Sequence, residues 1–254
     1  MVRLWAWMAN AGVGYPGLTE IESNLSQLRE RIHRASERAG RNPSEVQLVA
    51  VTKGFPPETI RLAAQTGLTQ VGENRVEEAL PKREALVDLP ELAWHMIGHL
   101  QSRKAALVPG AFRMVHSVDR LKIAGLLDQR AGSAGLRLPV LLQCNVSGEA
   151  TKSGWPLADR STWETVLPEF DHIARLPHLQ LMGLMTMAPI TPDPEAARPV
   201  FRILRQVAEF LRDRTPWGWE VLSMGMSDDF EMAVEEGATL LRIGRALFGP
   251  RLEG

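Results

Sequence analysis

Eight short apolar segments, most of them separated by segments with helical periodicity, constrain this sequence more than any other feature. Most begin about 20 to 25 residues after the previous one, which is within the usual length of a strand–helix–strand unit. Their apolar residues form runs rather than alternations, as in parallel strands that are covered on both faces. The segments predicted as strands are 46–52, 70–73, 94–100, 114–118, 139–146, 181–187, 220–224 and 239–243.

Eight such units in 254 residues predict an α/β protein with one (β/α)8 domain, the TIM-barrel architecture. A doubly wound open sheet is the alternative, because periodicity cannot show whether a sheet closes. No polar linker or change of composition divides the chain, so the barrel is expected to span residues 19–254. Residues 1–18 are interpreted as a loose N-terminal extension, since they are almost uncharged and are broken by glycine and proline.

The helical segments carry their own start and stop signals. Residues 19–39 are predicted as an amphipathic helix, with Thr19 and Glu22 at the spacing of a capping box. Proline disfavours a helix interior, so the helix after the second strand is expected to be interrupted at Pro81. A long helical region is predicted over residues 157–176.

Charge and cysteine content exclude several classes of protein. The formal net charge of -1 argues against a dedicated nucleic-acid binder, which would usually carry a basic excess. The single cysteine, Cys144, permits no internal disulfide, which fits a reducing cytoplasm. No segment is long and apolar enough to cross a bilayer. We therefore expect a cytoplasmic protein without nucleic-acid or membrane partners.

Lys53 is the first residue that suggests chemistry. It ends the first predicted strand, and the active site of a barrel lies at the carboxyl ends of its strands. Apolar neighbours would remove water from its amine and lower its pKa, which would make it a nucleophile toward an aldehyde. A lysine that simply points to solvent is equally compatible with this position.

Two segments near the C-terminus predict an anion site. Residues 222–229 follow the seventh strand and residues 242–245 end the eighth, where phosphate sites in such barrels often lie. In the first segment, small residues let backbone N–H groups approach an anion. Ser227, Asp228 and Asp229 could instead simply cap a helix.

Arg242 and Asn74 are further candidates for binding a ligand. Arg242 lies within the eighth strand and needs an acceptor there, either a ring nitrogen of a cofactor or the carboxylate of a structural salt bridge. Asn74 ends the second strand, where it could bind a ligand or cap the next helix. His95, His99 and His116 are interpreted as core or ligand-adjacent side chains, and no metal site is predicted.

Seven segments resemble the pyridoxal phosphate homeostasis proteins, the YggS/PROSC family, in the family's order. That family has the barrel of the alanine racemase N-terminal domain, a fold-type III PLP-binding fold, where PLP is pyridoxal 5'-phosphate. The matching segments are VAVTK (49–53), VGENRVEE (71–78), WHMIGHLQSRK (94–104), HSVDR (116–120), GLMTM (183–187), LSMGMSDDF (222–230) and RIGRALFG (242–249).

The resemblance implies a PLP site and assigns its residues. It implies that Lys53 holds PLP as an internal aldimine and that Arg242 faces the pyridine nitrogen. The phosphate would lie at Ser223, Gly244 and Arg245, bound largely by backbone N–H groups, and the ring pocket would be lined by Asn74 and Met224. The family usually has threonine where this chain has Arg245, so a hydroxyl contact to the phosphate would be lost. No catalytic residue is assigned.

Catalysis would need an electron sink and a base at the substrate. Arg242 is a permanent cation that only donates hydrogen bonds, so it favours the unprotonated ring, although racemases of this fold also use arginine. Those enzymes carry a C-terminal β domain that supplies tyrosine or cysteine, whereas here the only tyrosine is Tyr15 and the only cysteine is Cys144.

We therefore favour a PLP reservoir or delivery protein. It is expected to be monomeric, because the usual dimerising domain is missing, and its protein partners would be apo forms of PLP-dependent enzymes. One alternative is a weak PLP-dependent amino-acid racemase with His99 or a water as the second base. Another is a lyase that uses Lys53 without PLP.

Overall fold

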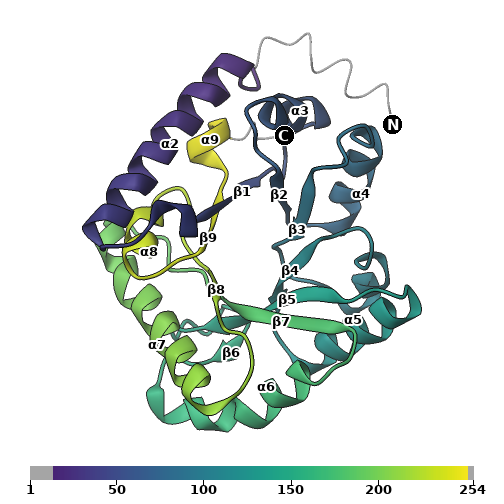
Figure 1. Cartoon of the computed structure of the whole chain (residues 1–254), viewed down its shortest axis with the longest axis vertical. Helices are drawn as coiled ribbons and strands as arrows, with labels where there is room; N and C mark the ends of the chain where they lie inside the picture. Colours follow the sequence, from purple (N-terminus) through teal and green to yellow (C-terminus); the bar gives the residue numbers. More distant parts are fainter. Residues whose placement is uncertain (1–13, 251–254) are drawn as a thin grey trace.

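The computed structural model describes residues 14–250, and eight parallel strands form a closed barrel within them (Figure 1). Around the ring, each strand pairs with its neighbours in the order β4-β3-β2-β1-β9-β8-β7-β5, and a β4–β5 pairing closes it. The predicted (β/α)8 barrel is thus confirmed and the open sheet is wrong, because an open sheet would leave two edges unpaired. The strands are β1 (Gln47–Val51), β2 (Gln70–Glu73), β3 (Ala93–Met96), β4 (Met114–Val118), β5 (Leu138–Asn145), β7 (Leu179–Met185), β8 (Val221–Ser223) and β9 (Leu240–Ile243).

Helices form the outer layer around this ring (Figure 1). The α-helices are α2 (Leu18–Arg38), α3 (Pro57–Gln65), α4 (Val76–Ala85), α5 (Leu121–Ser133), α6 (Leu167–Ala174), α7 (Arg198–Arg214), α8 (Phe230–Glu235) and α9 (Arg245–Phe248). Short 3-10 helices lie at η1 (Pro43–Glu45), η2 (Ser102–Leu107), η3 (Arg160–Val166) and η4 (Pro194–Ala197).

Two predicted helix signals differ from the structure. Helix α2 already begins at Leu18 after an extended Gly17, so Thr19 lies inside the first turn and does not cap the helix. Pro81 lies inside α4, which continues past it. Buried Ala79 and Lys82 on either side hold this helix against the barrel, and such tertiary contacts outweigh the hydrogen bond that proline removes.

The predicted helix over residues 157–176 is shorter and is preceded by an additional strand. Trp155–Pro156 forms the two-residue strand β6, which pairs with the end of β5. The chain then turns through η3 and becomes α-helical at Leu167, with Pro168 in the first helical turn, where its missing N–H costs nothing.

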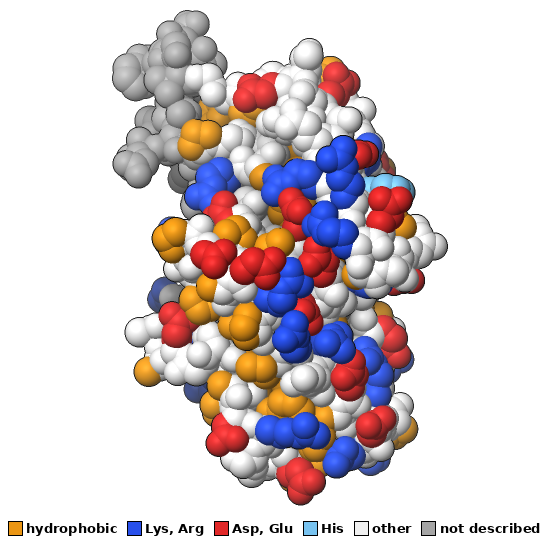
Figure 2. Space-filling model, turned by 90° about the vertical axis from the view of Figure 1, so that its left-hand side faces the viewer, with side chains coloured by type: hydrophobic (Ala, Val, Ile, Leu, Met, Phe, Trp, Pro, Cys, Tyr) orange, Lys and Arg blue, Asp and Glu red, His pale blue; other side chains and the backbone are white. Residues whose placement is uncertain are grey.

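Helix α2 packs along the barrel beside α8 and α9 (Figure 1). Its apolar stripe of Ile21, Leu25, Leu28 and Ile32 is buried at helical spacing. On the outer surface, basic side chains interleave with acidic ones (Figure 2). Arg38, for example, contacts both Glu231 and Glu235. Exposed pairs of this kind contribute little stability individually.

The N-terminal region is described only in part. Most of the predicted extension, residues 1–13, lies outside the described residues. Within the described part, Tyr15 packs edge-on against Phe55, with 6.0 Å between the ring centroids. No helix in residues 14–250 has the length and apolar character needed to cross a membrane.

Candidate functional site

The predicted site residues come together at the carboxyl ends of four neighbouring strands. Lys53 follows β1 and Asn74 follows β2, while Ser223 ends β8 and Gly244 follows β9. Strand β1 pairs directly with both β2 and β9, and β9 pairs with β8. Barrel closure therefore unites residues that lie far apart in the sequence (Figure 1).

Gly244 lets the turn after β9 lie against the end of β1. A Cβ atom added at this glycine would lie 3.4 Å from both the Cβ and the carbonyl oxygen of Val51, two residues before Lys53. Any side chain at position 244 would therefore occupy space close to the Lys53 turn.

Ser227 ties this turn to the loop after β8. Its hydroxyl accepts a hydrogen bond from the backbone N–H of Ala246, with 3.1 Å between the two atoms. In the same loop, the Asp229 carboxylate accepts a bond of 2.6 Å from the N–H of Met226. Sequence reasoning considered Ser227 only as a helix cap, whereas the structure uses it to join the two segments predicted to bind phosphate.

Arg242 lies inside the barrel and is only 4% exposed. Its Nη1 donates to the hydroxyl of Ser223 at 2.6 Å, and its Nη2 donates to the carbonyl of Thr186 at 2.8 Å. Burial lowers the pKa of Arg242 to about 10, and the nearby charge of Asp229 opposes this shift. The guanidinium thus stays charged at neutral pH and is held by two neutral acceptors rather than by a carboxylate.

Two buried histidines continue this chain of hydrogen bonds across the interior. Nδ1 of His116 lies 2.9 Å from the Ser223 hydroxyl, and its Nε2 lies 2.9 Å from Nδ1 of His95. Burial lowers the pKa of His95 to about 4, and burial also places the pKa of His116 well below its usual value. Both imidazoles are therefore neutral near pH 7.

Arg242 can only donate, so Ser223 is the acceptor of the bond between them. The Ser223 hydroxyl has one hydrogen and two acceptor positions, so it can either donate to Nδ1 of His116 or accept from it, and the tautomers of His116 and His95 follow from that choice. Among the described residues, Nε2 of His95 has no partner.

The remaining predicted residues occupy different environments around the strand ends. A Cβ added at Gly98 would lie 2.3 Å from the carbonyl oxygen of Asn74, so the backbones of these two residues are in close contact. Asn74 does not cap α4, which follows Arg75 without a side-chain cap. Met224 is fully buried, and the exposed guanidinium of Arg245 pairs with Asp228.

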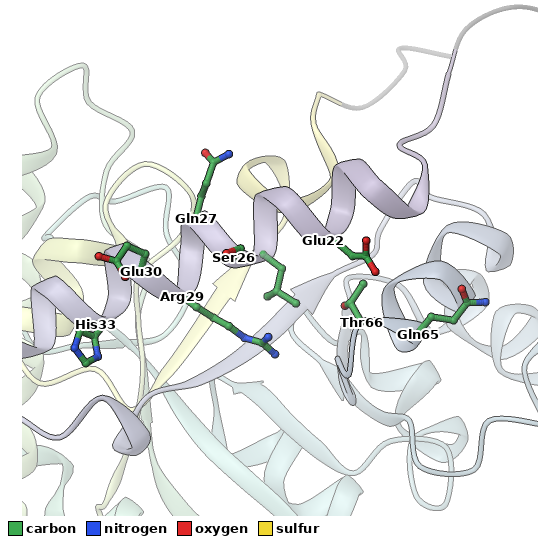
Figure 3. A pocket seen from close by; sticks show the side chains of 9 residues that line it. Glu22, Ser26, Gln27, Arg29, Glu30, His33, Gln65 and Thr66 are labelled. Carbon is green, nitrogen blue, oxygen red and sulfur yellow. The ribbon is translucent and has the colours of Figure 1, made fainter.

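A surface groove of about 900 Å³ lies elsewhere, between α2 and the end of α3 (Figure 3). Polar side chains such as Glu22, Arg29 and Gln65 line it. Gln65 ends α3 shortly before β2 begins, so the groove lies toward the amino ends of the strands. None of the predicted site residues lines this groove, and it is not the site at the carboxyl ends.

The groups at the strand ends fit PLP. Lys53 offers an amine. Arg242 offers a buried cation whose two hydrogen bonds go to neutral acceptors. A group that only donates disfavours protonation of a ring nitrogen beside it, whereas a carboxylate there would favour it. The turn at Gly244 lies close to the end of β1, and its backbone is joined to the Ser227 hydroxyl, so small residues and backbone N–H groups of the kind that suit a phosphate meet there.

Comparisons with known proteins also lead to PLP. The family model of the alanine racemase N-terminal domain matches residues 23–251. Proteins named pyridoxal phosphate homeostasis protein are similar along almost their whole length. The protein of Aquifex aeolicus is 43% identical over 89% of this chain and 96% of its own. That of Pseudomonas aeruginosa is 44% identical over 92% of this chain and 97% of its own.

Solved structures add a PLP-bound relative. PipY of Synechococcus elongatus PCC7942, determined with PLP bound, has a TM-score of 0.77 and 37% identity, over 90% of this chain and 100% of that one. Alanine racemase of Clostridium difficile 630 shares only the fold, with a TM-score of 0.70 and 15% identity over 91% of this chain and 56% of that one. The chain belongs to the alanine racemase N-terminal domain family and, within it, to the pyridoxal phosphate homeostasis proteins.

Proposed function

We propose that this protein binds PLP through Lys53 and acts in PLP homeostasis, as a store from which the cofactor is released to other proteins. The observation that carries this proposal is the convergence of Lys53, Arg242 and the Gly244 turn at one end of the barrel. Membership of a family that includes the PLP-bound PipY supports the same conclusion.

We propose a role in binding PLP for each of these side chains. The amine of Lys53 holds the cofactor, and Arg242 donates toward the ring nitrogen. Asn74 and Met224 line the ring pocket. When bound, PLP supplies an aldehyde that combines reversibly with amines and that absorbs visible light.

The phosphate contacts we propose differ slightly from those that the resemblance implies. The Ser223 hydroxyl is engaged with Arg242 and His116, so any contact from this residue would come from its backbone. Ser227 reaches the turn at Gly244 and is the hydroxyl donor that we propose instead. Arg245 is paired with Asp228 here, and we propose that it contributes through its backbone N–H.

The environment of Arg242 supports a carrier better than an efficient enzyme. A donor-only cation disfavours protonation of the ring nitrogen, and an unprotonated ring is the weaker electron sink. Release would proceed by attack of water or of another amine on the lysine-bound aldehyde carbon. We propose that apo forms of PLP-dependent enzymes receive the cofactor and that the protein acts as a cytoplasmic monomer.

Borohydride reduction of the PLP-loaded protein, followed by peptide mass mapping, tests the attachment site. We expect a phosphopyridoxyl adduct on the peptide that contains Lys53. Lys152 serves as a control, because it also lies in a loop after a strand, where it bonds to Glu149 and to the carbonyl of Met187. An adduct on Lys152 alone would contradict the proposed site.

A second candidate function is a racemase-like activity. The observation that favours it is the pair formed by His99 and Asp119, with 2.9 Å between Nδ1 and Oδ2. His99 follows β3 and is half exposed, so it could accept a proton from a bound amino acid. Exchange of the α-proton of amino acids in heavy water, lost in His99→Gln, would support this activity, and no exchange in the wild type would exclude it.

A further inference from the structure

A buried cluster of charged side chains lies directly behind the Lys53 turn. Lys82 of α4 is only 4% exposed, and its Nζ lies 2.7 Å from Glu73 Oε1 and 2.7 Å from Glu78 Oε1. The same ammonium donates to the carbonyl oxygen of Thr52 at 2.8 Å. Lysine is almost never buried unless it is paired. Removing the Lys82 ammonium from water costs free energy, which its carboxylate and carbonyl partners offset.

The cluster holds the residues on both sides of Lys53. On one side, Thr52 donates its hydroxyl to Glu73 at 2.7 Å and accepts from Lys82 through its carbonyl. On the other side, Gly54 donates its backbone N–H to Glu78 at 2.5 Å. Gly54 has a φ of 77°, a left-handed turn conformation that glycine adopts without steric cost.

The same cluster reaches the neighbouring strand. Glu73 is the last residue of β2 and directly precedes Asn74. Side chains alternate between the two faces of a strand, and those of Thr52 and Glu73 point outward, toward Lys82 of α4. Lys53 directly follows Thr52, and Asn74 directly follows Glu73, at the carboxyl ends of β1 and β2. One cluster thus sits behind two residues proposed to touch PLP.

We propose that Lys82, Glu73 and Glu78 form a positioning cluster that fixes the backbone of residues 52–54 and thereby aims the amine of Lys53. These residues act through the turn and do not themselves bind the cofactor. The inference rests on the proposed attachment of PLP to Lys53. Its consequence is kinetic, because a misplaced amine attacks the aldehyde more slowly while the proposed phosphate site still binds.

The test compares variants of two adjacent glutamates. Glu78→Ala removes the acceptor of the Gly54 N–H, whereas Glu78→Gln keeps an acceptor oxygen and should restore most of the function. Glu77→Ala is the matched control, because Glu77 precedes Glu78 on α4 but pairs with Lys104 outside the cluster. Lys82→Met removes the centre of the cluster. Since Lys82→Met could fail to fold, the decision rests on Glu78→Ala.

Three measurements are made on the full chain. In the protein without PLP, Glu78→Ala should increase hydrogen exchange of the Gly54 amide about tenfold or more. On mixing with PLP, its rate of attachment to Lys53 should fall about tenfold or more. The affinity for pyridoxine 5'-phosphate, which has the phosphate but no aldehyde, should remain unchanged. Glu77→Ala should match the wild type in all three.

Wild-type attachment rates in Glu78→Ala would overturn the positioning role, as would equal slowing in Glu77→Ala. Equal losses of affinity for pyridoxine 5'-phosphate and of attachment rate would also overturn it, since they would indicate general damage to the site. Failure of the proposed function is distinguishable, because the wild type would then show no adduct on Lys53 after borohydride reduction.

Discussion

Ser223 accepts a hydrogen bond from Arg242 across neighbouring strands, with 2.6 Å between the hydroxyl oxygen and Nη1. The same hydroxyl also bonds to His116, which in turn bonds to His95. One chain of hydrogen bonds therefore links four buried side chains from four strands. The position of Arg242 in the barrel depends on Ser223 and on the carbonyl of Thr186, to which its guanidinium donates.

Ser223→Ala and Ser227→Ala should affect different properties of the protein. Ser223→Ala removes the support of Arg242 and should shift the absorbance of bound PLP, with a loss of about 1–3 kcal/mol in the free energy of unfolding. Ser227→Ala should lower the affinity for PLP about tenfold and leave the spectrum unchanged, since a hydrogen bond to a charged group contributes about 1.5–3 kcal/mol. Absorbance titrations with PLP measure the spectrum and the affinity of each variant, and urea unfolding measures its free energy of unfolding. An unshifted spectrum in Ser223→Ala would argue against this support.

Lys53→Ala should abolish the absorbance band of lysine-bound PLP while the fold is retained. The residue lies in a turn after β1 and outside the regular strand pairing, so its truncation should cost little stability. Lys122→Ala, on the outer helix α5, is the control and should keep the full band. Circular dichroism and urea unfolding check the fold. A full band in Lys53→Ala would disprove the attachment site.

The buried histidines should make the protein less stable as the pH falls below about 6.5. Burial lowers the pKa of His95 to about 4 and lowers that of His116 well below its usual value. The unfolded chain binds protons on both near pH 6.5, and the folded chain does not. The free energy of unfolding should therefore decrease between about pH 6.5 and 4, by up to ~1.4 kcal/mol per pH unit for each histidine.

Replacing both histidines isolates their contribution. The double variant His95→Gln/His116→Gln should be less stable at pH 7 but should show a flatter dependence on pH. Carboxylates that titrate in the same range contribute equally to both proteins and cancel in the difference. His33→Gln, which changes an exposed histidine on α2, should follow the wild type. Parallel curves for the wild type and the double variant would contradict the assignment.

The sequence predicted the strands well because they are buried on both faces. The runs 70–73 and 114–118 coincide with β2 and β4, since covered parallel strands leave continuous apolar runs. The two-residue β6 had no such signal, because a pair as short as Trp155–Pro156 has no periodicity. Lys53 was found because it directly follows a predicted strand.

Pairings between distant side chains could not be predicted in the same way. Ser223 and His116 are separated by 107 residues and meet only because the barrel closes. Lys82 reaches the carbonyl of Thr52 from a helix whose proline predicted an interruption. Periodicity reports which face of an element is buried, but it does not report which polar groups meet behind that face.

Gly98→Ala should impair both stability and PLP binding through a steric contact. The added Cβ would lie 2.3 Å from the carbonyl oxygen and 2.7 Å from the Cα of Asn74, so the backbone of one of them must shift. Overpacking of this kind costs about 1–3 kcal/mol, and the shift would displace a residue of the proposed ring pocket.

Gly125→Ala is the control, because nothing lies within 4 Å of its added Cβ on helix α5. There alanine should stabilise the helix by about 0.5–1 kcal/mol. Urea unfolding and PLP titration of the two variants separate the general effect of replacing glycine from the contact with Asn74. Equal stability and unchanged PLP affinity in Gly98→Ala would show that Asn74 can move without affecting the site, and would remove it from the proposed ring pocket.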